Sequence, residues 1–258
     1  MNRFRVSGPP RALELALERI HVWNEVHGVL VEESGFEVYV DGRLPELSGV
    51  TISPLPVVTD WPTGREHDEP VYVGDSIMVR PPWVPSPPDF EGVELVVPRA
   101  MAFGSGEHAS TRAALAVMEK VVTDSVGCLA DVGTGSGILA RYAQLRGCQI
   151  IAACDIDRDS VVAAGELLSD VQVMEGGPDT IRGQFDCVVA NMRAAEILDC
   201  LAVILELWNR SGPLVLSGLR ESEVSDLIAA VDCPVELRIV CEDFTGLAFR
   251  AQTSGEAR

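Results

Sequence analysis

The feature that most constrains the fold of this chain is a regular alternation of strand-like and helix-like segments after about residue 110. Short apolar runs are typical of buried strands, whereas apolar residues spaced three or four apart are typical of amphipathic helices. Strands that alternate with helices form a mostly parallel sheet with helices on both faces. The predicted strands are 128–132, 149–154, 171–174, 185–190, 212–217, 235–240 and 246–249, and the predicted helices are 111–122, 138–145, 158–168, 194–208 and 221–230.

The two last predicted strands follow each other without a helix between them. Such a connection favours an antiparallel hairpin, because parallel neighbours need a long crossover. We therefore predict an α/β fold with an open, mostly parallel seven-stranded sheet and a C-terminal antiparallel hairpin at one edge.

The first 60 residues predict a separate, small α+β unit. Residues 4–6 form a possible edge strand, an amphipathic helix begins at Pro10 and ends near Val26, and strands follow at 29–31 and 36–40. Ten prolines between residues 54 and 98 indicate a stiff connector, with a possible hairpin made by 71–73 and 77–79. The predicted organisation is a small α+β domain at 1–60, a Pro-rich linker with a short hairpin at 61–98, the α/β domain at 99–252 and a disordered tail at 253–258.

Composition and charge narrow the function classes. The chain has 39 acidic and 20 basic residues, a net charge of −19, so it should repel the phosphates of nucleic acid. The same charge suits a basic protein partner, although it could serve solubility alone. No apolar run reaches the ~18–20 residues needed to span a bilayer, and the N-terminus shows no secretory signal. The seven cysteines and four histidines show no metal-ligand spacing, which favours a metal-free protein of the reducing cytoplasm.

The strongest chemical signal is a glycine-rich turn at the end of the strand 128–132. The segment Asp131-Val-Gly-Thr-Gly-Ser-Gly137 leads from that strand into a helix, so Gly133, Gly135 and Gly137 allow close approach of a ligand to the backbone. Twenty-two residues after Gly133, Asp155 ends the next strand, where a carboxylate can accept hydrogen bonds from both ribose hydroxyls. Together these residues predict a site for an adenosine-type nucleotide.

The glycine spacing selects among nucleotides. Dinucleotide-binding turns read Gly-x-Gly-x-x-Gly, whereas this turn reads Gly-x-Gly-x-Gly with Asp131 two residues before the first glycine. That acid would repel a pyrophosphate but can hold the ammonium group of a methionine moiety. The pattern resembles the first motif of class I S-adenosylmethionine methyltransferases, and we predict S-adenosylmethionine as the cofactor.

Two further segments lie next to this predicted site. Residues 102–111 form a glycine-rich stretch before the first helix of the α/β domain, with Ser and Thr suited to capping that helix. Asn191 follows the strand 185–190 at the predicted carboxyl edge of the sheet. Its side-chain oxygen can accept a hydrogen bond from a target amine, although an Asn is also common as a plain turn residue.

Taken in order, these segments resemble the PrmA family, the methyltransferases of large-subunit ribosomal protein L11. The resemblance covers about residues 70–250 and rests on segments 73–83, 101–111, 131–140, 155–157 and 188–192. It implies a Rossmann-like class I methyltransferase fold, an N-terminal substrate-recognition domain and transfer of methyl groups to lysine or N-terminal amines of a ribosomal protein. It also implies that Thr111, Gly133, Asp155 and Asn191 contact the cofactor, that Phe103 and His108 lie in a loop closing over it, and that Asn191 is the catalytic residue.

The chain departs from the family pattern at several positions. Ser105, Ala109 and Ser110 replace a Thr, a Pro and a Thr, and Met192-Arg193 replaces Ile-Leu after Asn191. The N-terminal region is also shorter than in the family. A class I methyltransferase acting on another protein or a small metabolite is therefore the main alternative, followed by a nicotinamide-dependent oxidoreductase and a cofactor-binding module without catalysis.

Overall fold

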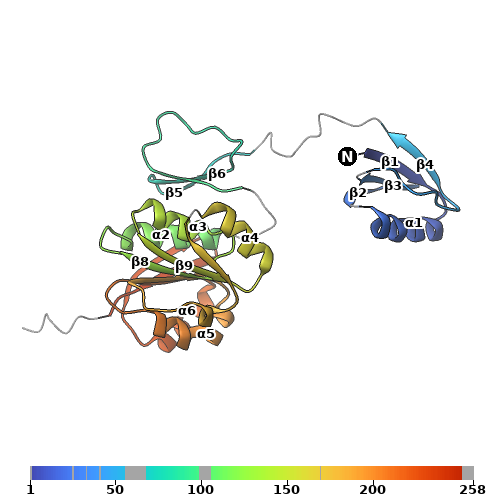
Figure 1. Ribbon diagram of the computed structural model, residues 1–258. Helices are drawn as coiled ribbons and strands as arrows, with labels where there is room; N and C mark the ends of the chain where they lie inside the picture. Colours follow the sequence, from blue (N-terminus) through green and yellow to red (C-terminus); the bar gives the residue numbers. More distant parts are fainter. Residues whose placement is uncertain are drawn as a thin grey trace, which may run out of the picture. The chain divides into compact units, whose positions relative to one another are not determined.

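The computed structural model describes residues 2–24, 26–32, 34–40, 42–55, 68–98, 106–168 and 170–251. These residues belong to two units, Met1–His67 and Asp68–Arg258 (Figure 1). Within the described residues, no helix combines the length and the apolar character needed to cross a membrane.

The N-terminal unit is a four-stranded antiparallel sheet with one helix. Its strand order is β2-β3-β1-β4, and its elements are β1 (Asn2–Ser7), α1 (Pro10–Trp23), β2 (Val26–Glu32), β3 (Gly35–Val40) and β4 (Thr51–Leu55). The prediction that residues 4–6 form an edge strand is wrong, because β1 pairs with β3 on one side and with β4 on the other. β4 was not predicted because it contains Pro54. Proline lacks an N–H group and is tolerated in a sheet mainly on an edge strand, which is where β4 lies.

Alternation of side chains along β1 and β3 separates the two faces of this small sheet. Val6 and Val38 pack in a core with Ile20 of α1. On the opposite face the carboxylate of Glu37 binds Arg3 and lies 2.7 Å from Arg5 Nη2. The hydrogen bond from the Arg3 guanidinium is the main reason why the pKa of Glu37 lies below its usual value.

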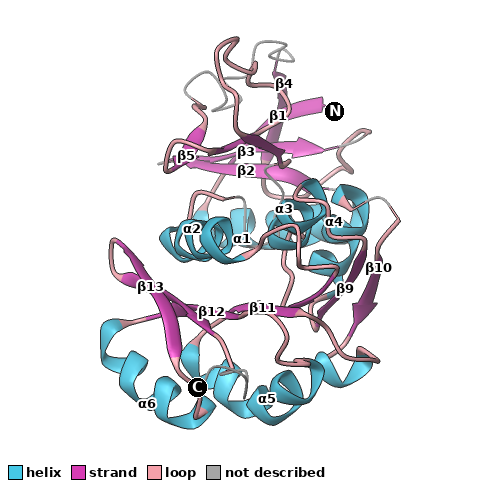
Figure 2. Cartoon of the chain, turned by 90° about the vertical axis from the view of Figure 1, so that its left-hand side faces the viewer, coloured by secondary structure: helices cyan, strands magenta, loops and turns pink. Residues whose placement is uncertain are grey.

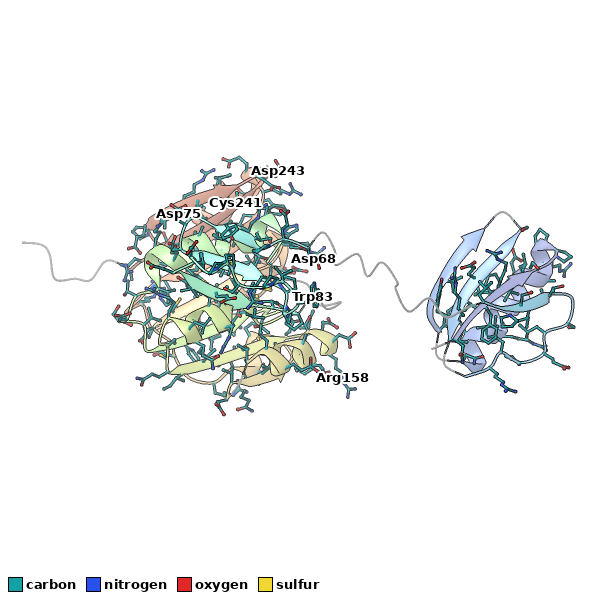
Figure 3. All side chains as sticks on the ribbon, turned by 90° about the horizontal axis from the view of Figure 1, so that it is seen from above. Asp68, Asp75, Trp83, Arg158, Cys241 and Asp243 are labelled. Carbon is teal, nitrogen blue, oxygen red and sulfur yellow. The ribbon has the colours of Figure 1, made fainter. Side chains whose placement is uncertain are left out.

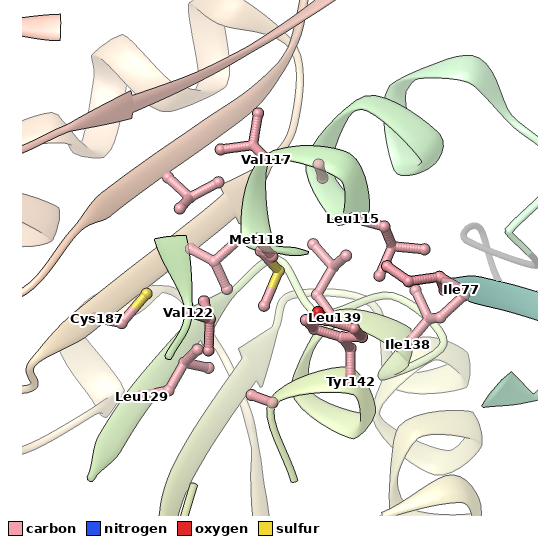
Figure 4. Packing of buried hydrophobic residues seen from close by; sticks show 14 of the residues in the cluster. Ile77, Leu115, Val117, Met118, Val122, Leu129, Ile138, Leu139, Tyr142 and Cys187 are labelled. Atoms are coloured by element: carbon pink, nitrogen blue, oxygen red, sulfur yellow. The ribbon is translucent and has the colours of Figure 1, made fainter. Parts of the chain in front are cut away.

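Residues 68–98 form a small sheet that belongs to the second unit. The predicted hairpin is confirmed, since β5 (Val71–Val73) pairs antiparallel with β6 (Ile77–Arg80), while β7 (Val93–Val96) adds to β6 in parallel. Ile77 packs in one buried cluster with Leu115, Ile138 and Tyr142 (Figure 4). The proline spacing therefore does not make this stretch a linker, because its apolar strands pack on the helices of the α/β unit.

The large sheet of the second unit has seven strands in the order β10-β9-β8-β11-β12-β14-β13. Parallel pairing holds throughout except for β14, which runs antiparallel to both β12 and β13, as the predicted hairpin requires. This confirms the predicted fold class. The strands are β8 (Cys128–Val132), β9 (Ile150–Asp155), β10 (Gln172–Glu175), β11 (Cys187–Asn191), β12 (Leu214–Leu219), β13 (Val235–Cys241) and β14 (Phe244–Phe249).

Helices cover both faces of this sheet (Figures 1 and 2). On one face lie α2 (Ala109–Val121), α3 (Ile138–Leu145) and α4 (Arg158–Leu167), and on the other lie α5 (Ala194–Leu207) and α6 (Glu221–Val231). The chain runs from β8 outward to β9 and β10, and then returns to β11 on the other side of β8. This reversal is a topological switch point at the carboxyl ends of β8 and β11, the place at which open α/β sheets form the crevice that binds their ligands.

Candidate active site

The glycine-rich turn lies at that crevice and needs its glycines for backbone reasons. Gly133, Gly135 and Gly137 all have positive φ values, of 69°, 55° and 84°. A side chain would strain each of them. Gly137 caps the N-terminus of α3, and a Cβ there would lie 3.2 Å from the backbone of Ala164 in α4. The turn therefore brings bare backbone and the N-terminus of a helix to the sheet edge.

Asp131 lies beneath this turn and is fully buried, with 0% of its surface exposed. Its Oδ2 accepts hydrogen bonds from Thr134 Oγ1 at 2.7 Å and from the Ala140 amide at 3.1 Å. Among the described residues its Oδ1 has no hydrogen-bond partner. Burial raises the pKa of Asp131 to about 6, so the carboxylate is largely ionised at pH 7 at a cost in solvation. A cation with N–H donors would satisfy the open oxygen.

Asp155 ends β9 beside the glycine turn. Its Oδ2 accepts a hydrogen bond from the Gly135 amide at 2.8 Å, and its Oδ1 accepts one from the Asp157 amide at 2.9 Å. These bonds fix the carboxylate but leave each oxygen a further lone pair, which suits two neighbouring hydroxyls. The next residue, Ile156, is 81% exposed. Ile156 was not predicted as a site residue, although an apolar residue directly after the acid at the end of a strand was the available signal.

Asn191 and Thr111 are 80 residues apart in sequence and meet at the carboxyl end of β11. Asn191 Nδ2 donates to Thr111 Oγ1 at 3.3 Å, and Thr111 is fully buried in the first turn of α2. Asn191 Oδ1 is buried and has no partner in the described part of the chain. The hydrogen bond to Thr111 fixes the orientation of the amide, so the free acceptor is the oxygen rather than the nitrogen.

Met192 contacts two glycines from different strand ends, Gly133 after β8 and Gly218 in β12. Its side chain lies over Gly133, where a Cβ would come within 2.5 Å of the Met192 sulfur. Its backbone lies against Gly218, which has a φ of +91° and whose Cβ would lie 2.3 Å from the Met192 carbonyl oxygen. Gly218 lies at an irregularity in the pairing of β12 with β14. Met192 was predicted only as a departure from the family pattern, and Gly218 was not predicted at all, because no local pattern indicates their contact.

Arg193 does not place a free cation beside Asn191. Its side chain is 84% exposed and turns along α5, where its Nε lies 3.0 Å from Glu196 Oε1. The Arg193 amide also donates to Glu196 Oε2 at 3.0 Å, which caps the start of α5. The positive charge of Arg193 is therefore paired with Glu196 in the first turn of α5.

His108 has a structural role at the start of α2. Its Nδ1 accepts a hydrogen bond from the Ser110 amide at 3.2 Å, and its ring lies against Phe244 of the β13–β14 hairpin. Phe103 lies outside the described residues, as do residues 102–105 of the predicted closing loop. Of the other predicted site residues, the structure brings Thr111, Asp131, Gly133, Gly135, Gly137, Asp155 and Asn191 to the same edge of the sheet.

Fold and site together define a class. The sheet order, with a glycine turn after the central strand β8 and an acid at the end of β9, is that of a Rossmann-like class I methyltransferase. The family model described as "Ribosomal protein L11 methyltransferase (PrmA)" matches residues 56–242. The chain belongs to this family.

Individual relatives agree with this placement. Proteins named "Ribosomal protein L11 methyltransferase" from Geobacter metallireducens and Geobacter sulfurreducens are each 34% identical, over 73% and 64% of this chain. The chain spans 66% and 58% of the length of these two relatives. A crystal structure of the ribosomal protein L11 methylase from Lactobacillus delbrueckii subsp. bulgaricus superposes with a TM-score of 0.65 at 25% identity, covering 71% of this chain and 98% of the other.

Proposed function

We propose that this chain is an S-adenosylmethionine-dependent N-methyltransferase that acts on lysine or N-terminal amines of a ribosomal protein of the L11 type. The observation that carries this proposal is the buried Asn191 Oδ1, which lacks a partner among the described residues at the carboxyl end of β11. An amine donor is the group that would satisfy it. Membership of the L11 methyltransferase family supports the choice of substrate.

The residues at the crevice fit S-adenosylmethionine. The open Oδ1 of Asp131 suits the methionine ammonium, the glycine turn Gly133–Gly137 offers backbone groups without side chains, and Asp155 suits the ribose hydroxyls. The exposed Ile156 suits one face of the adenine. When bound, the cofactor supplies a methyl group on a sulfonium, which is an electrophile toward a neutral amine.

The contribution of the chain is positioning. Asn191, held by Thr111, would orient the lone pair of a bound amine for attack on the methyl group, as a bimolecular displacement requires. Lysine has a pKa of ~10.4 and must lose a proton before it can react. The neutral acceptor Asn191 Oδ1 stabilises an ammonium less than a carboxylate would, so it would hold the amine without strongly favouring its unreactive charged form. Transfer would form one N–C bond for the S–C bond that breaks, and the methylated ammonium would lose a proton to solvent.

Charge supports a basic partner. Residues 1–67 carry 6 bases and 10 acids, a net charge of −4, and residues 68–258 carry 14 bases and 29 acids, a net charge of −15. Both units therefore attract a lysine-rich protein, and the attraction weakens as salt shortens the Debye length from ~10 Å at 0.1 M.

The main alternative, a methyltransferase acting on a small metabolite or another protein, gains no support from Arg193. The Arg193 cation, which favoured this alternative, is paired with Glu196 and highly exposed. The competing classes are separated by titrating the full chain with S-adenosylhomocysteine and with NAD, because an oxidoreductase would bind NAD alone.

The substrate is tested by incubating the full chain with labelled S-adenosylmethionine and either a purified L11-type ribosomal protein or a total protein extract. We expect label on the ribosomal protein, on a lysine or the N-terminal amine. Label on a different protein, or on small molecules only, would contradict the proposed substrate while leaving the methyltransferase class intact.

Replacing Asp155 with alanine is expected to weaken S-adenosylhomocysteine binding at least tenfold. The variant loses two charge-assisted hydrogen bonds to the ribose, each worth ~1.5–3 kcal/mol before solvation is counted. Calorimetry on the folded variant measures the dissociation constant. Asp157→Ala is the matched control, because it removes a nearby acid that caps α4; equal affinity of Asp155→Ala and the unmodified chain would reject this placement of the ribose.

Replacing Asp131 with asparagine is expected to stabilise the free protein and weaken cofactor binding. Because the pKa of Asp131 is raised to about 6 in the fold, its contribution to stability is full below the unfolded pKa and is lost as pH rises through 6. Removing the buried charge should therefore raise the free energy of unfolding at pH 7 by on the order of 2 kcal/mol, with little change near pH 4.

Urea unfolding at the two pH values measures the stability of Asp131→Asn, and calorimetry at pH 7.5 measures its affinity. We expect the affinity for S-adenosylhomocysteine to fall at least tenfold, because the methionine ammonium loses its counter-charge. Unchanged affinity together with higher stability would mean that Asp131 only supports the glycine turn.

A further inference from the structure

A stack of three side chains joins α6, the β13–β14 hairpin and α2 at the carboxyl edge of the sheet. Arg220 directly follows β12 and precedes α6, and its Cζ lies 4.2 Å from the centroid of the Phe244 ring. Its Nη1 also lies 3.3 Å from Oδ2 of Asp243, at the tip of the hairpin (Figure 3). A planar guanidinium can stack flat on an aromatic face while its edge binds a carboxylate, a geometry that the compact ammonium of lysine does not reproduce.

Phe244 also contacts His108, the residue that caps the N-terminus of α2. The ring centroids of Phe244 and His108 are 4.7 Å apart, with an angle of 62° between the planes. His108 in turn holds three amides of the first turn of α2: its Nδ1 accepts from Ser110, and its carbonyl oxygen accepts from Thr111 and Arg112. His108 therefore contacts the first turn of α2 through both its ring and its backbone carbonyl.

The same turn of α2 contacts the reaction centre. Thr111 Oγ1 accepts the hydrogen bond that orients the Asn191 amide. The Ser110 carbonyl accepts a hydrogen bond of 2.9 Å from Ser217 Oγ in β12, three residues before Arg220. The contacts thus close a ring from β12 through α2, His108, Phe244 and Arg220 back to the end of β12.

The β13–β14 hairpin also contacts α2 further along the helix, at Arg112 and Ala113. Arg112 forms an ion pair with Glu242, and β14 comes so close that a Cβ on Gly246 would lie 3.0 Å from the Ala113 carbonyl oxygen. These contacts hold the backbone of the hairpin, whereas Arg220 covers the face of the Phe244 ring.

We propose that Arg220 is a positioning residue for methyl transfer: it holds Phe244 against His108 and thereby fixes the turn of α2 that orients Asn191. The inference deepens the proposed function and rests on it for its kinetic consequence. Arg220 is placed to act through Phe244 and His108, so its loss should lower turnover without changing the affinity for the cofactor.

The test compares Arg220→Lys with a matched control in the full chain. Arg210 also stacks on an aromatic ring, 5.2 Å from the centroid of Trp208, but it lies in the turn that precedes β12, at the opposite edge of the sheet. We expect Arg220→Lys to lower kcat for the ribosomal protein about fivefold, with KM and the dissociation constant of S-adenosylhomocysteine within twofold. Arg210→Lys should change none of these. Asp243→Asn removes the ion pair but leaves the stack, and it should keep kcat within twofold.

A double-mutant cycle and an activity-independent measurement complete the test. Phe244→Leu and Arg220→Ala should each lower kcat. The kcat of the double variant should be no lower than that of the less active single variant, because both substitutions break the same contact. Amide exchange of Ser110, Thr111 and Arg112 should be faster in Arg220→Ala than in Arg210→Ala. Equal exchange in the two variants, or additive losses of kcat, would overturn the proposal.

The exchange result also separates this inference from the proposed function. If the unmodified chain methylates no ribosomal protein, the proposed function fails. Faster exchange in Arg220→Ala would even then support Arg220 as the residue that holds the first turn of α2, and unchanged exchange would reject it.

Discussion

Replacing Asn191 with alanine is expected to lower kcat for a ribosomal protein substrate by about 100-fold, comparable to the loss of one preorganised hydrogen-bonding group in other enzymes. The variant loses the only group at the end of β11 that the structure shows as buried, oriented and free to accept from an amine within the described residues. Since Thr111 and the rest of the turn remain, we expect the melting temperature to fall only slightly. Steady-state kinetics and thermal unfolding measure the two effects.

Two companion variants show whether Asn191 acts by orienting a neutral amine. Thr111→Val removes the hydroxyl that accepts from Asn191 Nδ2 but leaves Asn191 Oδ1 in place. We therefore expect kcat to fall less than in Asn191→Ala. Asn191→Asp adds a negative charge that stabilises the unreactive ammonium, so its activity should reach a maximum at higher pH than that of the unmodified chain. Full turnover in Asn191→Ala would make Asn191 a turn residue and place the reaction centre elsewhere.

Removing residues 1–67 is expected to abolish methylation of the protein substrate, by at least 100-fold, while S-adenosylhomocysteine still binds within twofold. The second unit contains the whole seven-stranded sheet and every described residue of the candidate site, whereas the first unit has its own core around Ile20 and Val38. We infer that the first unit serves to recognise the protein substrate. Calorimetry and labelled methyl transfer measure the two properties.

The alternative to a recognition role is that the N-terminal unit only stabilises the second unit and that the acidic charge only increases solubility. Two measurements distinguish these explanations: the melting temperature of the shortened chain, and the salt dependence of protein methylation by the intact chain. If the shortened chain still methylates the protein at the full rate, and salt has no effect on the intact chain, the recognition role is wrong.

Patterns that depend on near neighbours in sequence could be predicted. The glycine turn, the acid at the end of β9 and the alternation of strands and helices are local, and the structure confirms the sheet and its C-terminal hairpin. The same holds for Asn191, since the carboxyl ends of parallel strands meet at one edge.

Features that depend on distant contacts could not be predicted. β1 is a central strand because β4 pairs with it across 43 intervening residues, between Ser7 and Thr51. The Pro-rich stretch became part of the second unit because Ile77 packs with Leu115 and Ile138. Gly218 and Phe244 carry no local signal, since their roles come from Met192 and His108.

The position of β14 has a consequence for how the chain folds. β14 inserts between β12 and β13, although it follows both of them in sequence. Until it docks, the edge of β12 keeps unpaired N–H and C=O groups beside the apolar side chains of Leu214, Val215 and Leu216. Such an edge is a template for pairing with another chain, so a partly folded intermediate, or a chain shortened before β14, should be prone to aggregate.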